Sequence, residues 1–292
     1  MVTGGADGVR RRILFVVLVD ISASLTDYVP ASCMVENRLL SEVVIERLNE
    51  LIAELYRRYN GDQSSYREVA VVGYSGNGVK TIVGDGGRRA IPIAELGQIS
   101  ISGEWLEIRA LTQLDRFGWY DELPCGDSMA EGCLDFKGCR AMLMGFLTAA
   151  KVVEEWQREQ LFDERSRACV INLTGGIPED CSAEVLDGAA QFVKSINRDN
   201  TLVMNVLMNE RSDSRRDFSY PTDKELARDR SLLVRLLASL SSVVDGRRAV
   251  GVNASVLEML SRLDIDGEKF AAKSSKEHQK AQEKQAKLSV AN

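Results

Sequence analysis

The stretch ILFVVLVDISASL, residues 13–25, decides the fold. Seven apolar residues stand in a row and end at Asp20, after which Ser22 and Ser24 follow in the spacing D-x-S-x-S. An uninterrupted apolar run of this length predicts a strand covered on both faces, since a half-exposed strand alternates apolar and polar residues. Carboxylate and hydroxyl oxygens are ligands for hard metal ions, so the three polar residues form a candidate metal site.

Further apolar runs alternate with segments of helical periodicity along the chain. The segment 36–59 has apolar side chains at helical spacing, which predicts a long amphipathic helix. The other predicted strands are 68–75, 79–84, 167–176, 201–209 and 247–252, and the other predicted helices are 139–161, 182–196, 224–244 and 254–263. This alternation predicts an α/β fold with a doubly wound, mostly parallel central sheet and helices on both faces. The Gly-Asn-Gly turn before residue 79 predicts one antiparallel edge strand.

The chain is expected to form a single folded domain, residues 12–267. Residues 1–11 are Gly-rich and are expected to be flexible, and an inserted loop region of about 85–135 interrupts the domain. Residues 268–292 form a polar tail with six lysines and three glutamates, a formal charge of +3. Such a tail is either a solvated segment or a basic handle for an acidic partner.

Composition and charge exclude several classes of function. The 292 residues carry a formal net charge of −6, which argues against nucleic-acid binding by the folded domain. No apolar stretch is long enough to span a bilayer, so no membrane partner is expected. The single histidine, His278, lies in the tail, which excludes a Ser-His-Asp triad in the domain. Six cysteines without a C-x-x-C pair suit free thiols in a reducing cytoplasm.

The inserted region holds aromatic candidates for partner binding. Trp105, Trp119 and Tyr120 stand there in a polar, Gly-rich context. Two interpretations stay open: an exposed interaction patch, or side chains that pack the insertion onto the core.

The order of elements resembles a von Willebrand factor A (VWA) domain over residues 12–265. The residues that carry this resemblance are the strand ending in D-x-S-x-S, the long helix after it, and the strand VAVVGYS at 69–75. Members of this family often carry a metal-ion-dependent adhesion site. The resemblance implies that Asp20, Ser22 and Ser24 would hold Mg²⁺, joined by a threonine from a turn that opens a later helix and by an aspartate from an L-T-D-G strand end. A carboxylate of the partner protein would then complete the octahedral coordination of the metal.

This sequence departs from the family pattern at two of the five ligands. In GCRAMLMGF, 138–146, aligning Met142 with the family methionine puts Arg140 where the threonine is expected. In LTGG, 173–176, Gly175 stands where the second aspartate is expected. We expect a metal-free site in which the Arg140 guanidinium forks onto Asp20, because a buried carboxylate needs a partner.

A rival interpretation keeps the metal at this site. Asp20, Ser22 and Ser24 would then hold Mg²⁺ with help from one more carboxylate. Candidates on nearby predicted loops are Asp127, Asp135, Glu179 and Asp180. The last two also suit a turn and a helix start, where acidic residues and caps are favoured.

By resemblance, the chain is expected to be a non-enzymatic adaptor or scaffold. Intracellular bacterial relatives, including those associated with tellurium resistance, are linked to kinases, phosphatases or AAA+ ATPases in stress-response and defence systems. The contact face would be the crest, the surface beyond the strand ends that includes Asp20, with the insertion as its specificity element. The alternatives are a VWA protein with metal-dependent ligand binding, or a hydrolase that uses a metal at Asp20. The missing ligands and the lack of a clear general base stand against the hydrolase.

Overall fold

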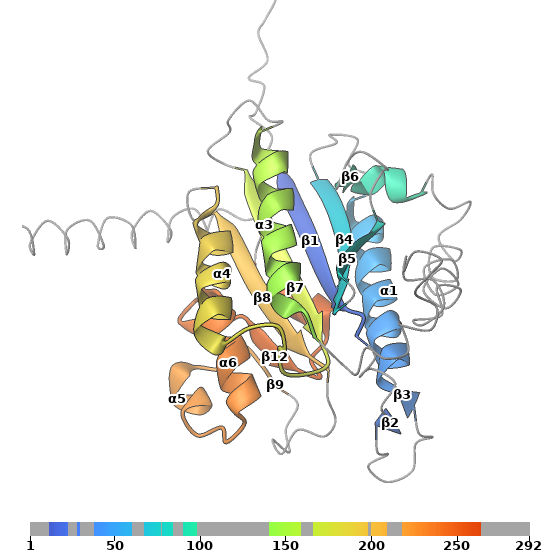
Figure 1. Cartoon of the computed structure of the whole chain (residues 1–292). Coiled ribbons are helices and arrows are strands. Elements are labelled where there is room, and N and C mark those ends of the chain that lie inside the picture. The colour runs from blue at the N-terminus through green and yellow to red at the C-terminus, as the bar shows by residue number, and fades with distance from the viewer. Residues whose placement is uncertain are drawn as a thin grey trace, which may run out of the picture.

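The computed structural model describes most of the expected domain (Figure 1). The described residues are 12–22, 28–29, 38–59, 67–76, 78–83, 90–97, 140–158, 166–197, 200–208 and 218–263. Several sequence predictions therefore lie outside the described residues, namely those on residues 1–11, Ser24, Trp105, Trp119, Tyr120, Asp127, Asp135 and the tail 268–292.

A central sheet forms the middle layer of the fold. Its strands lie in the order β5-β4-β1-β7-β8-β12-β9, and β6 pairs with β4. The bounds are β1 Ile13–Asp20, β4 Arg67–Ser75, β5 Gly78–Val83, β6 Ile91–Pro92, β7 Arg167–Thr174, β8 Thr201–Leu207, β9 Phe218–Ser219 and β12 Val250–Val252. Strands β4, β1, β7, β8 and β12, which are neighbours in this order, are parallel. Strand β5 is the predicted antiparallel edge strand. The short β9 adds an antiparallel strand at the opposite edge.

Helices cover both faces of this sheet, which confirms the predicted doubly wound class. One face is covered by α1 Leu40–Tyr59, α7 Val256–Arg262 and the 3₁₀ helix η2 Ile93–Gly97. The other face is covered by α3 Met142–Arg158, α4 Ala183–Ser195, α5 Asp223–Leu226 and α6 Leu232–Leu240. Phe15 and Val17 of β1 face the α1 side, while Leu14 and Val16 face the α3 side. Both sides are buried, which explains the unbroken apolar run. No described helix is long and apolar enough to cross a membrane.

The structure corrects the predicted boundaries between residues 224 and 252. The single helix expected at 224–244 is two helices, because a new helix cap forms at Ser231. The Ser231 hydroxyl caps α6 by accepting the N–H of Val234, and the backbone N–H of Ser231 donates to the Asp229 carboxylate. A small hairpin of β10 Val243–Val244 and β11 Arg247–Arg248 then precedes β12. Asp245 and Gly246 both have positive φ, which is typical of a two-residue Asp-Gly hairpin turn.

The start of the long helix also differs from the prediction. Helix α1 begins at Leu40 rather than at residue 36. The two residues before it, β3 Arg38–Leu39, pair with β2 Tyr28–Val29 in a separate two-stranded ribbon. Backbone pairing with this nearby segment of the chain therefore takes the place of the first helical turn.

The strand order creates one switch point at the crest. The chain leaves β1 for β4 and β5 on one side, and later returns through β7 on the other side of β1. In sheets of this kind, sites form outside the carboxyl ends of the two strands that flank the reversal. Those ends, Asp20 of β1 and Thr174 of β7, lie at the lower end of the molecule in Figure 1.

Two helical glycines predict opposite effects of an added methyl group. A Cβ at Gly145 of α3 would lie 2.8 Å from Cδ1 of Tyr74, whose ring is fully buried, whereas a Cβ at the exposed Gly188 of α4 would meet no atom within 4 Å. We expect Gly145→Ala to lower the free energy of unfolding by about 1–3 kcal/mol through overpacking. Gly188→Ala should raise it by about 0.5–1 kcal/mol through helix propensity. Urea unfolding of both variants measures this, and equal effects would contradict the assigned packing.

Candidate functional site

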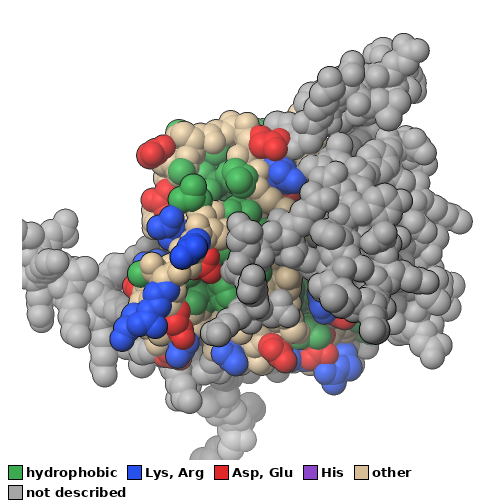
Figure 2. All heavy atoms as spheres, turned by 90° about the horizontal axis from the view of Figure 1, so that it is seen from below, with side chains coloured by type: hydrophobic (Ala, Val, Ile, Leu, Met, Phe, Trp, Pro, Cys, Tyr) green, Lys and Arg blue, Asp and Glu red, His purple; other side chains and the backbone are tan. Residues whose placement is uncertain are grey.

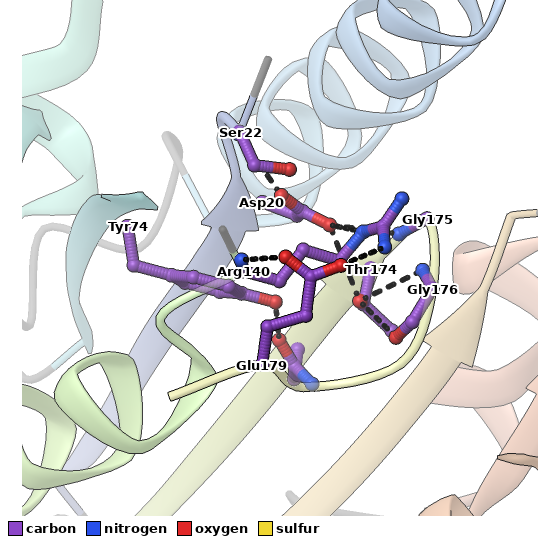
Figure 3. A network of polar contacts seen from close by, with 9 residues as sticks. Asp20, Ser22, Tyr74, Arg140, Thr174, Gly175, Gly176 and Glu179 are labelled. Atoms are coloured by element: carbon purple, nitrogen blue, oxygen red, sulfur yellow. Dashed lines mark hydrogen bonds and ion pairs between the residues drawn. The ribbon is translucent and has the colours of Figure 1, made fainter. Parts of the chain in front are cut away.

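The Asp20 carboxylate is the centre of the crest, and it is completely buried. Its Oδ1 accepts the N–H of Ser22 at 3.0 Å. Its Oδ2 accepts the N–H of Gly175 at 3.1 Å and the hydroxyl of Thr174 at 3.4 Å (Figure 3). The turn after β1 and the end of β7 therefore both hold the carboxylate in place.

Arg140 supplies the positive charge beside this carboxylate. It lies just before α3, and its side chain is only 14% exposed. Its Nε lies 3.4 Å from Asp20 Oδ2, and its Nη1 lies 3.4 Å from Glu179 Oε1. The two side chains that the sequence suggested as a pair are thus in contact. The guanidinium does not make the predicted two-bond fork on Asp20, because it is shared between two carboxylates and Nε has no hydrogen-bond partner.

The guanidinium lies directly against the glycine turn that follows β7. A Cβ at Gly176 would stand 2.6 Å from Cζ and 2.8 Å from Nη1 of Arg140. No side chain at position 176 can coexist with this arginine in its observed place. The space that the arginine occupies therefore depends on Gly176, the residue that follows the missing second aspartate.

Glu179 and Asp180 fasten the loop after β7 to the start of α3. The Glu179 N–H donates to the carbonyl of Arg140 at 3.0 Å, and the Arg140 N–H donates to Glu179 Oε2 at 3.2 Å. Asp180 Oδ2 accepts the N–H of Met144 in the first turn of α3 at 3.3 Å, a favourable place for an anion. Ser182, rather than Asp180, caps the following helix α4. Of the four proposed extra metal ligands, the two that the structure describes thus have other contacts.

A row of buried polar side chains extends sideways from the crest, and the sequence analysis missed it. The Tyr74 hydroxyl donates to Asn172 Oδ1 at 3.0 Å, Asn172 Nδ2 donates to Asn205 Oδ1 at 2.9 Å, and Asn205 Nδ2 donates to Ser241 Oγ at 2.9 Å. Burial and the nearby Asp20 carboxylate raise the pKa of Tyr74 well above its ordinary value. The available signal was one asparagine inside each of two apolar strands, in positions that the sheet register places side by side.

These residues do not fit the magnesium site that the family resemblance implies. Protein donors already bind both oxygens of Asp20, and a guanidinium lies 3.4 Å from one of them. A divalent cation at Asp20 would face repulsion from Arg140 and would lack the ligands that threonine and the second aspartate supply. Among the described residues, no group of three or more His, Cys, Asp or Glu side chains is placed to hold a metal.

Comparisons with known proteins give structural neighbours only. No family model matches the chain, and no curated protein matches it. The VWA domain of SpRpn10 has a TM-score of 0.44 and 10% identity, with coverage of 87% of this chain and 96% of that one. A von Willebrand factor type A protein from Catenulispora acidiphila has a TM-score of 0.43 and 13% identity, with coverage of 87% and 41%. Proximal thread matrix protein 1 from the mussel byssus has a TM-score of 0.44 and 12% identity, with coverage of 88% and 48%.

The chain therefore spans less than half the length of the mussel and Catenulispora proteins. At these identities, the likeness concerns the fold alone.

The contact between Arg140 and Gly176 predicts a coupled pair of variants. Arg140→Met leaves the buried Asp20 without its cation and should cost roughly 3 kcal/mol of unfolding free energy. Gly176→Ala should also destabilise the native chain, because its methyl group displaces the guanidinium. In the Arg140→Met background that collision is gone, so Gly176→Ala should then cost much less. Urea unfolding of the four proteins measures the coupling.

The matched control for this cycle is Arg158→Met. Arg158 forms an ion pair with Glu154 at 3.7 Å, but its side chain is 77% exposed. Surface pairs of this kind contribute about 0–1 kcal/mol, so the control should be nearly silent. Strictly additive losses for Arg140→Met and Gly176→Ala would contradict the packing of the guanidinium on the turn.

Proposed function

We propose that this chain is a non-enzymatic protein-interaction module, an adaptor or scaffold of the VWA type, whose crest binds a protein partner without a metal. The observation that carries the proposal is the ion pair between Arg140 and the fully buried Asp20. A fixed guanidinium stabilises the carboxylate that a divalent ion would otherwise neutralise. The crest would thus keep its shape whether or not divalent ions are present.

The chemistry of the crest supports a binding role over a catalytic one. A general acid or base needs a pKa near the working pH and access to substrate. Asp20 is completely buried and held by several donors, while burial raises the pKa of the Tyr74 hydroxyl far from neutrality. The sole histidine of the chain, His278, belongs to the tail. Neither side chain at the centre of the crest is suited to transfer protons.

The finer assignment comes from the family resemblance of the sequence. It would make the chain a cytoplasmic part of a bacterial stress-response or defence system, with a kinase, phosphatase or AAA+ ATPase as partner. The competing proposal is a magnesium-dependent VWA protein, either a ligand binder or a hydrolase. One observation favours it: Asp180 Oδ1 is buried without a hydrogen-bond partner, which leaves one carboxylate oxygen near the crest available.

Purification of the tagged full chain from its cells of origin tests the adaptor role. A partner should co-purify in equal amount with Mg²⁺ or with EDTA, because no metal takes part in the contact. Glu179→Lys reverses a half-exposed charge at the crest and should reduce recovery at least about fivefold. The control Glu258→Lys, on exposed α7 surface, should not change recovery.

Two results would contradict the proposal. Loss of the partner in EDTA would make the contact metal-dependent and favour the competing proposal. Failure of any protein to co-purify in reproducible stoichiometry would remove the adaptor role itself.

A further inference from the structure

The exposed large hydrophobic side chains are concentrated on one part of the molecule. Seven such side chains occur among the described residues. Two of them, Leu232 and Val243, belong to α6 and β10. The other five belong to α3, α4 and the loop before α4, and they define what we term the α3–α4 face: Met144, Leu147, Ile177, Val185 and Phe192.

Spacing along the helices places these side chains on shared stripes. Met144 and Leu147 are three residues apart on α3, and Val185 and Phe192 are seven apart on α4. Residues at these intervals lie on the same side of a helix. The two helices pack side by side, and both begin at the crest (Figure 1). The α3–α4 face is therefore a continuation of the crest along two neighbouring helices.

A small residue interrupts the stripe on α4. Gly188 lies between Val185 and Phe192, and a Cβ there would meet no atom within 4 Å. A glycine in this place allows the backbone or a large side chain of another molecule to approach closely. The stripe thus has two apolar side chains with a recess between them.

The five hydrophobic side chains of the α3–α4 face are about half exposed to solvent, and none of them belongs to the buried core. Their exposed fractions are between 45% and 57%. Single exposed apolar residues are common, whereas contiguous groups mark interaction sites. Figure 2, which views the molecule from the crest end, shows hydrophobic side chains gathered there, with both acidic and basic side chains around them. We therefore interpret the face as a surface that another polypeptide covers.

The uncompensated charge around the face is negative and lies at its crest end. Glu179 and Glu184 are exposed there, and Arg140, which Glu179 shares with Asp20, is mostly buried. A hydrogen bond from its own backbone and one from Ser182 lower the pKa of Glu184, so this carboxylate is charged at neutral pH.

At the far end of the face the charges of α3 balance. Lys151 pairs with Glu155 at 3.8 Å and Arg158 pairs with Glu154 at 3.7 Å. A ligand lying along α3 and α4 therefore meets apolar surface along its length and negative charge at one end only.

We propose that the α3–α4 face binds an amphipathic helix of the partner protein, with apolar residues at helical spacing and lysine or arginine at the end that lies by the crest. Helices of this kind bind shallow apolar surfaces through i, i+3 and i+7 contacts, and complementary charge fixes their direction. The inference rests on the proposed adaptor function and specifies its surface and partner chemistry. The chain's own tail is a poor occupant, because it is lysine-rich but contains few large apolar residues.

A synthetic helix tests this chemistry directly against the full chain. The probe is a labelled peptide of about 18 residues, long enough to form a helix, with leucines along one stripe and lysines at one end. Fluorescence anisotropy should show saturable binding. The double variant Leu147→Gln, Phe192→Gln should weaken it at least about tenfold, and Glu184→Lys about threefold. Glutamine keeps helix propensity, so these variants should fold.

Two matched controls distinguish binding at the α3–α4 face from non-specific hydrophobic binding of the peptide. Leu232→Gln removes the most exposed hydrophobic side chain elsewhere, 73% exposed, and should leave binding unchanged. A peptide with glutamates in place of lysines should bind at least about tenfold more weakly.

Four results would overturn the inference: equal binding of the glutamate peptide, unchanged binding by the double variant, tighter binding after deletion of residues 268–292, or a dimer that Leu147→Gln dissociates. The last two would identify the tail or a second copy as the occupant. If the cellular partner co-purifies and the double variant still retains it, the inference fails while the adaptor function stands.

Discussion

The completely buried carboxylate at the end of strand β1 determines which donors and charges the rest of the crest must supply. Burial of the Asp20 carboxylate is costly unless hydrogen-bond donors and a cation compensate for the lost water. The turn after β1, the end of β7 and the start of α3 each supply one part of what it needs. Three segments far apart in the sequence are thereby fixed relative to one another, and contacts of Glu179 and Asp180 fasten the β7–α4 loop to α3.

An arginine and a metal ion differ in how they compensate the charge of the buried carboxylate. A divalent ion requires several oxygen ligands, and its occupancy follows the ion concentration. A guanidinium is covalently part of the chain and stays charged at any physiological pH. It needs only space, which Gly176 provides, and a second carboxylate, Glu179, to share its charge. The proposed metal-free crest is therefore a permanent surface rather than one that responds to ion concentration.

The fold was predictable because its strongest signals are local. The run at 13–19 is apolar at every position, and only a strand packed on both faces needs that. Boundaries were less predictable where short backbone pairings decide them. The ribbon of β2 and β3 takes residues from the start of the predicted long helix, and the Asp245–Gly246 turn marks a hairpin inside a segment read as one helix and one strand.

The site was predictable only as far as the family pattern reaches. That pattern pointed to Arg140 and Gly175, and the structure brings both to Asp20. The sharing of the guanidinium with Glu179, its packing on Gly176, and the polar row from Tyr74 to Ser241 depend on the register of distant strands and on three-dimensional packing. The absence of metal at this site and the role of the crest in binding remain proposals.

Calorimetric titration with Mg²⁺ and Mn²⁺ tests the central claim most directly. It should compare the native chain, Asp20→Ala, and the double variant Arg140→Thr, Gly175→Asp, which restores the two ligands that the family pattern expects. The account predicts no binding heat for the native chain and saturable binding for the double variant. Binding by the native chain that disappears in Asp20→Ala would contradict it, because the guanidinium would then not take the place of the ion.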